Sequence, residues 1–438
     1  MKRSITNETA QYSISLLVVV AGLFAKQIFI FYAAKMLSPK EFGQLVWVLA
    51  QSEILAMIFL FGGGNAFIRE VLQRSANPSR SLLLNYLIVG TKAILLIVCA
   101  CATVAYIFLG QTVVQTYALV ALIAVSNCFL ELMKSSTKIM GFAIISEIPK
   151  SIILPVIATL AFVLHGNIPS KTDIFNPGTL YLLSCATALA ISTLGTLFLL
   201  RRLPDISDDN LAAPSIARWF VVSAPLMAYA LLFQFNTQAA VLLSGYLGHQ
   251  AEAGLLGFAS SYASFSTLGL LAVNVIVVPK IAALYRSGEL ASLQKMLSKA
   301  NLFAIFVFVL IATLLWIIKP YYISSSGFQH EQVSEAIDLI ILAQFVSVLC
   351  GTVGYVTIMT KKQREAIGVL TISMIVQIAI IFFPLLSLDA KSSILAAYVA
   401  SIVVSNIGLL WVCIVRVRVS PFFGLAGLSS LKMPSGKA

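Results

Sequence analysis

Long apolar runs separated by short polar segments repeat along the whole chain. A bilayer core about 30 Å thick is crossed by about 20 apolar residues in a helix. Lipid cannot hydrogen-bond open backbone groups, so runs of this length predict helices, and the alternating segments of about ten residues typical of barrel strands are absent. Twelve such runs predict twelve transmembrane helices: 12–34, 41–62, 81–109, 112–133, 149–165, 178–200, 219–247, 253–278, 300–318, 336–359, 366–384 and 392–415.

Composition supports a membrane protein. The 438 residues are 59% hydrophobic and 11% charged, with a mean hydropathy of +0.96, whereas soluble domains are roughly 25% charged. These values exclude a soluble globular enzyme, a disordered chain and a secreted disulfide scaffold. The first apolar run follows Lys2 and Arg3 like a signal peptide, but it is too long and Lys26 interrupts it. We therefore expect a retained helix.

The net charge of +12 has a topological explanation. If the N-terminus is inside, the cations of the outer segments are Lys35, Lys40, Lys171, Lys319 and Lys391, and Lys26 and Lys92 lie within spans. All the other Lys and Arg residues, among the 29 in total, fall on the inner side. Such a bias in short loops fixes orientation. We expect both termini in the cytoplasm and no nucleic-acid partner.

The most polar stretch of the chain lies near its midpoint. Residues 201–217 contain two prolines and three aspartates, which is typical of a linker. The sequence therefore predicts an N-terminal six-helix half, a cytoplasmic linker, a C-terminal six-helix half and a cytoplasmic tail, at 1–200, 201–217, 218–415 and 416–438.

A weak internal repeat supports two halves. Glu41 and Gly43 match Glu252 and Gly254 at an offset of 211 residues. Because each half has an even number of helices, the repeat is parallel, about an axis along the membrane normal. The segment from Ser38 to Glu41 has the spacing of a capping box, with proline at the first helical position.

The segment from Leu37 to Gly43 (L-S-P-K-E-F-G), followed by an apolar helix with a glycine-rich end, resembles the opening of Wzx-type polysaccharide flippases. Their superfamily also contains MATE drug exporters and the lipid II flippase. The resemblance implies an all-α integral membrane protein with two six-helix halves around a central cavity. It also implies transfer of undecaprenyl-pyrophosphate-linked oligosaccharides across the bacterial inner membrane by alternating access, for O-antigen or other surface polysaccharide synthesis.

Three charged residues lie deep in predicted spans, all in the N-terminal half: Lys26, Lys92 and Glu53. A lipid pyrophosphate needs cations, since its charge cannot enter hydrocarbon unaided, so Lys26 and Lys92 are candidates to bind it. Snorkelling to the interface is the competing interpretation. Glu53 is the candidate coupling or counter-ion residue, or else a structural glutamate. Glu131, near an inner helix end, is expected at the interface.

The predicted spans of the C-terminal half contain no deep charge but several amides. Gln234, Asn236, Gln238 and Asn274 are weak candidates to face a glycan. Hydrogen bonding between helices explains them equally well.

Two other functions compete with a flippase. A drug or cation antiporter would favour acids over lysines along its path. A polytopic enzyme of polysaccharide synthesis would need a large outer loop or paired carboxylates, and none is evident. We therefore expect no enzymatic activity, no cofactor and no metal site, with coupling to a proton or Na⁺ gradient left open. The expected partners are the lipid-linked glycan, membrane lipids, and polysaccharide polymerase and chain-length regulator proteins.

Overall fold

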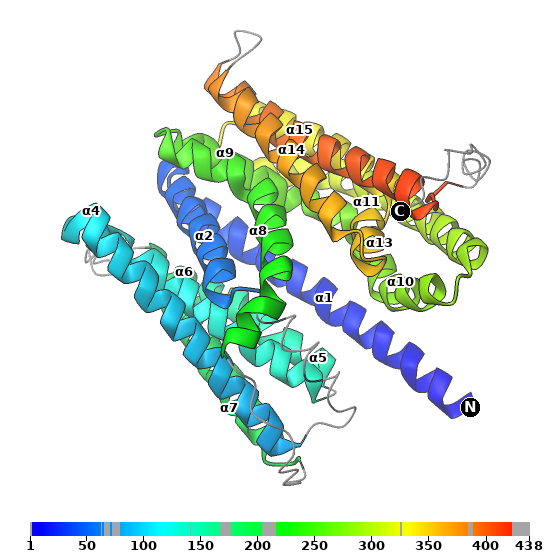
Figure 1. The fold of residues 1–438 in the computed structure, drawn as a ribbon. Helices are drawn as coiled ribbons and strands as arrows, with labels where there is room; N and C mark the ends of the chain where they lie inside the picture. Colours follow the sequence, from blue (N-terminus) through cyan, green and yellow to red (C-terminus); the bar gives the residue numbers. More distant parts are fainter. Residues whose placement is uncertain are drawn as a thin grey trace. The chain divides into compact units, whose positions relative to one another are not determined.

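The computed structural model describes residues 2–62, 64, 71, 79–140, 142–166, 177–203, 216–324, 326–383 and 389–422. Throughout these ranges the regular structure is helical, with no β-strand. Most of the predicted linker and tail, residues 204–215 and 423–438, lies outside them. The all-α fold class is therefore confirmed for the described chain (Figure 1).

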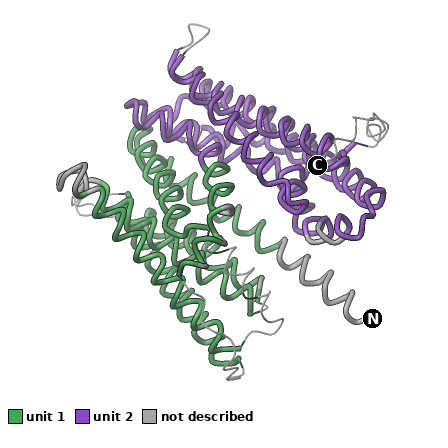
Figure 2. The backbone as a smooth tube through the Cα atoms, viewed as in Figure 1, with its two compact units in different colours: residues 1–234 green, residues 235–438 purple. Residues whose placement is uncertain are grey.

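The chain forms two compact units, Met1–Gln234 and Phe235–Ala438 (Figure 2). Unit 1 contains α1 (Lys2–Met36), α2 (Pro39–Leu60), α4 (Arg80–Ile139), α5 (Ala143–Ile148), the π-helix η1 (Pro149–Ile153), α6 (Leu154–Gly166), α7 (Pro177–Leu200) and the start of α8 (Ile216–Tyr246). Unit 2 contains the rest of α8, α9 (Gln250–Ala263), the 3₁₀ helix η2 (Ser264–Thr267), α10 (Leu268–Arg286), α11 (Leu290–Ser324), α12 (His330–Cys350), α13 (Val353–Met359), α14 (Gln363–Phe382), α15 (Ala390–Val412) and the π-helix η3 (Cys413–Val417).

The two units divide within α8, whereas the sequence places the division in the linker 201–217. The first turns of α8 pack on unit 1: Trp219 is buried in its hydrophobic core, and the ring of Phe220 meets that of Phe61 edge-on at 5.0 Å. Apolar contact therefore assigns the start of this helix to unit 1.

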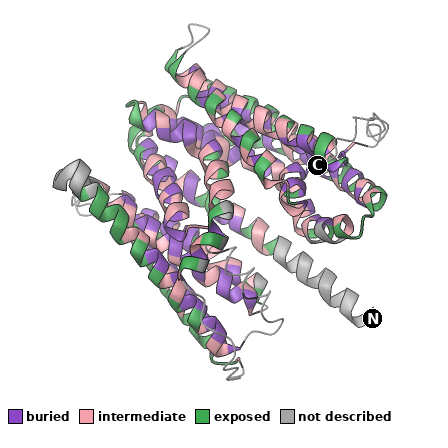
Figure 3. Ribbon diagram, viewed as in Figure 1, coloured by how far each residue is buried: buried purple, intermediate pink, exposed green. Residues whose placement is uncertain are grey.

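Eleven helical segments of the described chain are long and apolar enough to cross a membrane. They coincide with eleven of the twelve predicted spans. The remaining predicted span, 219–247, lies in the 31-residue helix α8, which is not one of these eleven segments. The chain is therefore a multi-pass membrane protein. Apolar side chains stay exposed on many of its helices, as contact with lipid requires (Figure 3).

Helix α4 contains two predicted spans, 81–109 and 112–133, in 60 helical residues. If α4 were straight it would be about 90 Å long, and Gly90 would lie about 63 Å from Leu132. A Cβ atom on Gly90 would instead lie 3.2 Å from Leu132 Cδ1. The two limbs, Arg80–Val104 and Tyr117–Ile139, therefore lie side by side, and the chain reverses between them as the sequence predicts.

The predicted capping box is present at the start of α2. Ser38 donates its backbone N–H and its hydroxyl to Glu41 Oε2 over 2.9 and 2.7 Å, and the Glu41 N–H donates to Ser38 Oγ. Helix α9 of unit 2 begins at Gln250, 211 residues after Pro39 at the start of α2. The helix starts thus repeat at the offset of the sequence match, although α9 lacks a side-chain cap.

Helix α1 packs closely on η1 at Gly22. A Cβ atom there would lie 2.7 Å from Ser151 Cβ and 3.1 Å from its carbonyl oxygen. We expect Gly22→Ala to destabilise the protein by about 1–2 kcal/mol, because overpacking outweighs the helix propensity of alanine. The measurement is the midpoint of thermal unfolding in detergent. Gly195→Ala is the control, since nothing lies within 4 Å of its Cβ position. Equal midpoints for the two variants would contradict this packing.

Candidate functional site

Lys26 lies on the face of α1 that packs into unit 1, yet its side chain is exposed. It follows Gly22 by four residues and precedes Phe29 and Ala33 by three and seven, and all three are buried. Residues at these spacings share one helix face. The apolar side chains of Phe24 and Ile28 are exposed on the other side of α1. Lys26 therefore occupies an open position on the inward side of its helix.

Lys92 is placed differently. The residues on its face of α4, at spacings of three, four and seven, include Ile88, Leu95, Leu96 and Cys99, and all are exposed. An exposed apolar stripe of this kind suits contact with lipid, and there a lysine stem can extend along the hydrocarbon towards the interface. The helix faces that carry the two lysines thus differ in burial: the neighbours of Lys26 are buried and those of Lys92 are exposed.

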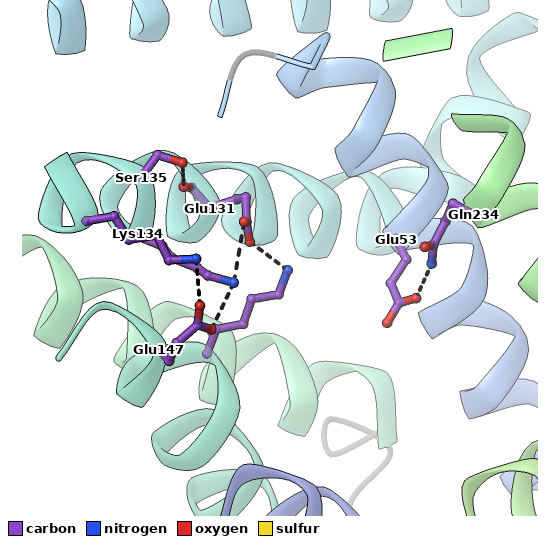
Figure 4. Close-up of polar contacts among 8 residues, drawn as sticks. Glu53, Glu131, Lys134, Ser135, Glu147 and Gln234 are labelled. Atoms are coloured by element: carbon purple, nitrogen blue, oxygen red, sulfur yellow. Dashed lines mark hydrogen bonds and ion pairs between the residues drawn. The ribbon is translucent and has the colours of Figure 1, made fainter. Parts of the chain in front are cut away.

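Glu53 is half-buried on α2. Its Oε2 accepts a hydrogen bond of 2.6 Å from Gln234 Nε2, at the end of the unit 1 part of α8 (Figure 4). Glu53 also lies close enough to Lys150 and Tyr181 for its charge to act on both. Two predicted site residues, Glu53 and Gln234, are thus brought together, which the sequence analysis did not predict.

Beside Glu53, five charged side chains form an ion-pair cluster: Glu131, Lys134 and Lys138 from the second limb of α4, Glu147 from α5 and Lys150 from η1 (Figure 4). Lys134 Nζ lies 2.9 Å from Glu147 and 3.5 Å from Glu131. Lys138 Nζ lies 2.7 Å from Glu147, and Lys150 Nζ 3.2 Å from Glu131. All five side chains are partly buried.

The sequence analysis assigned these lysines to inner loops and Glu131 to the interface. In the structure, Glu131, Lys134 and Lys138 belong to the helical segment Tyr117–Ile139, and Glu147 and Lys150 to Ile144–Leu164, two segments long and apolar enough to cross a membrane. The opposite charges are paired with one another, which lowers the cost of partly burying them. Lys150 is in a π-helical turn, a distortion frequent at functional sites. The sequence signal that could have indicated this ion-pair cluster was the close spacing of its three lysines and two glutamates along the chain.

The predicted amides of unit 2 have separate positions. Asn236 is buried, donates to the Leu370 carbonyl of α14 over 2.9 Å, and accepts from Ser401 Oγ of α15 at 3.3 Å. These bonds join α8 to α14 and α15. They agree with the alternative of the sequence analysis, in which the amides form hydrogen bonds between helices. Gln238 is half-buried on α8, and the Asn274 Oδ1 of α10 is buried without a hydrogen-bond partner among the described residues.

Unit 2 also contains an ion pair between two helices that the sequence analysis did not predict. Lys319 of α11 donates to both carboxylate oxygens of Asp338 of α12, over 2.8 and 2.7 Å. Both residues lie inside candidate spans. At 1.5 Å per residue they are roughly 8 and 12 Å from the ends of their helices. The sequence analysis ended the ninth span at 318 and placed Lys319 in a loop, but α11 continues to Ser324.

The described residues contain no group of three or more His, Cys, Asp and Glu side chains arranged to hold a metal ion. The ion-pair cluster of unit 1 consists of ammonium and carboxylate groups in contact. Such a set can exchange one anion for another, or bind and release protons.

The fold places the chain in a structural class. No family model and no curated protein sequence matches it. Comparison of structures shows that it has the fold of the lipid II flippase MurJ and of MATE transporters of the MOP superfamily.

The likeness covers nearly the whole length of each protein. The lipid II flippase MurJ in an inward closed conformation matches with a TM-score of 0.67 and 15% identity, over 92% of this chain and 87% of that one. The MATE multidrug transporter DinF-BH matches with a TM-score of 0.60 and 15% identity, over 93% and 94%. A point mutant of the Vibrio cholerae MATE transporter VcmN matches with a TM-score of 0.58 and 13% identity, over 94% and 96%.

Proposed function

We propose that this protein is a flippase of the bacterial inner membrane that moves an undecaprenyl-pyrophosphate-linked oligosaccharide by alternating access. The cargo is a repeat unit of O-antigen or of another surface polysaccharide. The fold shared with a lipid II flippase supports transport of a lipid-linked sugar. The L-S-P-K-E-F-G segment, whose capping box starts α2, supports a Wzx-type flippase.

One observation carries the choice of an anionic cargo: Lys26 is exposed on the inward face of α1 although its neighbours on that face are buried. A lysine in this position gives a diphosphate a charge-assisted contact within the membrane depth. Lys92 is not part of the proposed site, because its face of α4 is exposed and apolar. The headgroup site is thus proposed in unit 1.

Glu53 is the proposed coupling residue. Its half-buried carboxylate accepts from Gln234 and lies near the charge of Lys150. A proton or Na⁺ bound there would change the balance of charge around the headgroup. Movement of the lipid requires no covalent step, so we propose no enzymatic activity and no cofactor. Polysaccharide polymerase and chain-length regulator proteins are the proposed partners.

A drug or cation antiporter is the second candidate. The MATE fold supports it, and so does the acidic face of α12, where Glu331, Glu335 and Asp338 border a hollow of about 530 Å³. Two of these carboxylates are already neutralised, since Lys319 pairs with Asp338 and Lys391 with Glu335.

Deletion of the gene tests the proposed function. We expect lipid-linked repeat units to accumulate on the cytoplasmic leaflet, because glycan assembly continues while transfer stops. The measurement is the leaflet distribution of the labelled lipid-linked glycan in intact and permeabilised cells, with the complemented strain as control. Unchanged leaflet distribution, together with increased drug sensitivity, would favour the antiporter.

A further inference from the structure

In the ion-pair cluster of unit 1 each carboxylate bridges two ammonium groups. Glu131 lies between Lys134 and Lys150, at 3.5 and 3.2 Å, and Glu147 lies between Lys134 and Lys138, at 2.9 and 2.7 Å. The two lysines around Glu131 come from different elements, α4 and η1. One small anion therefore links two segments of the unit.

The charge of the cluster explains why anions are held there. Three lysines and two glutamates leave one positive charge within candidate membrane spans, where an uncompensated charge is costly. Glu53 supplies a third carboxylate near Lys150. With Glu53 the set is neutral, so the protein's own carboxylates satisfy the lysines when no other anion is bound.

The geometry around Glu131 also suits a larger anion. Lys134 Nζ and Lys150 Nζ both lie within 3.5 Å of the same carboxylate, so a diphosphate in its place could contact one lysine with each phosphate. Lysine is a compact charge on a flexible stem and can follow an anion that is larger than a carboxylate.

Helix α1 packs against the π-helical segment of the cluster. Gly22 of α1 lies against Ser151, and Ser151 directly follows Lys150. The cluster therefore lies beside the helix that carries Lys26.

We propose that Glu131 is an internal anion that the diphosphate headgroup of the lipid-linked substrate replaces on Lys134 and Lys150. The inference rests on the proposed function and adds residues and a binding mode to it. The carboxylate of Glu131 then has two effects: it satisfies the lysines of the empty protein, and it opposes the bound headgroup by repulsion. Removing its charge strengthens headgroup binding, whereas removing the charge of Lys150 weakens it.

Binding of farnesyl diphosphate to the purified full-length protein in nanodiscs tests this proposal. We expect Glu131→Gln to lower Kd about tenfold and Lys150→Met to raise it about tenfold, the effects of close charge pairs. Glu335→Gln, which alters an exposed carboxylate of unit 2, is the control with unchanged Kd. Inorganic pyrophosphate is a second probe. If the Kd of Glu131→Gln and Lys150→Met changes in the same way with pyrophosphate, the site recognises the diphosphate alone. If the Kd changes only with farnesyl diphosphate, the site recognises the diphosphate as a lipid headgroup.

A Kd of Glu131→Gln equal to or higher than that of the unaltered protein overturns the proposal. If this variant fails to fold, the double variant Glu131→Gln/Lys150→Met replaces it. The double variant should bind more tightly than Lys150→Met alone, and equal affinity overturns the proposal. Farnesyl diphosphate that binds with the same Kd to every variant overturns this inference alone, whereas the absence of any binding to the unaltered protein also contradicts the proposed cargo.

Discussion

Lys26→Ala is expected to reduce transport of the lipid-linked glycan on the order of 100-fold, the effect of removing one partner of a charge-assisted contact in a desolvated site. Lys26 is exposed on the inward face of α1, between buried residues, and alanine removes its charge. Lys26→Arg keeps the charge and should retain most of the activity. The measurement is complementation of a flippase deletion, together with initial transport rates in proteoliposomes.

Lys92→Ala is the matched control, because it removes the same side chain from another membrane helix of the same unit. Its face of α4 is exposed and apolar, so its removal should leave transport within about twofold of the unaltered protein, as expected for a snorkelling side chain. If both alanine variants are correctly inserted and Lys26→Ala transports as well as Lys92→Ala, the assignment of Lys26 is wrong.

Asp338→Asn is expected to destabilise the protein by roughly 2 kcal/mol. Lys319 donates two hydrogen bonds to this carboxylate, and its side chain is only 10% exposed, so the variant leaves a charge without its counter-ion. Breaking a fully buried pair costs about 3–5 kcal/mol. The smaller value applies here because Asp338 is 52% exposed and water screens the interaction. The measurement is thermal unfolding of the purified protein.

Two variants separate this explanation from a general weakness of α12. Lys319→Met/Asp338→Leu removes both charges and should recover most of the lost stability, because no unpaired charge remains. Glu335→Gln, one turn earlier on α12, affects a carboxylate that is 63% exposed and 3.8 Å from Lys391; it should change the stability by less than about 0.5 kcal/mol. A double variant that is less stable than Asp338→Asn would contradict the charge argument.

Hydropathy alone predicts most of the fold. Eleven predicted spans coincide with helical segments long enough to cross a membrane. The reversal within α4 and the capping box at Ser38 and Glu41 also follow from sequence. These features depend on apolar runs and local hydrogen bonds, which are readable along the chain.

The sequence analysis missed charged pairs that continue helices beyond their apolar runs. Lys319 was placed in a loop because the ninth predicted span ended at residue 318, and Lys150, the second residue of the fifth predicted span, was counted with the cations of the inner side. Each has a carboxylate partner 19 residues away, Asp338 and Glu131, on another helix. The sequence also could not show which helix face each of Lys26 and Lys92 occupies, since both lie in continuous apolar segments without a polar side. Only packing distinguishes the inward face of α1 from the exposed face of α4.

Transport by the purified protein in proteoliposomes tests the central claim most directly. The lipid cargo is a fluorescent prenyl-diphosphate-linked sugar, and its exposure on the outer leaflet is followed by quenching, with a cationic dye as the competing cargo. The account predicts translocation of the diphosphate lipid that requires Lys26 but not Lys92, and no dye transport. Transport of the dye without movement of the lipid would contradict it.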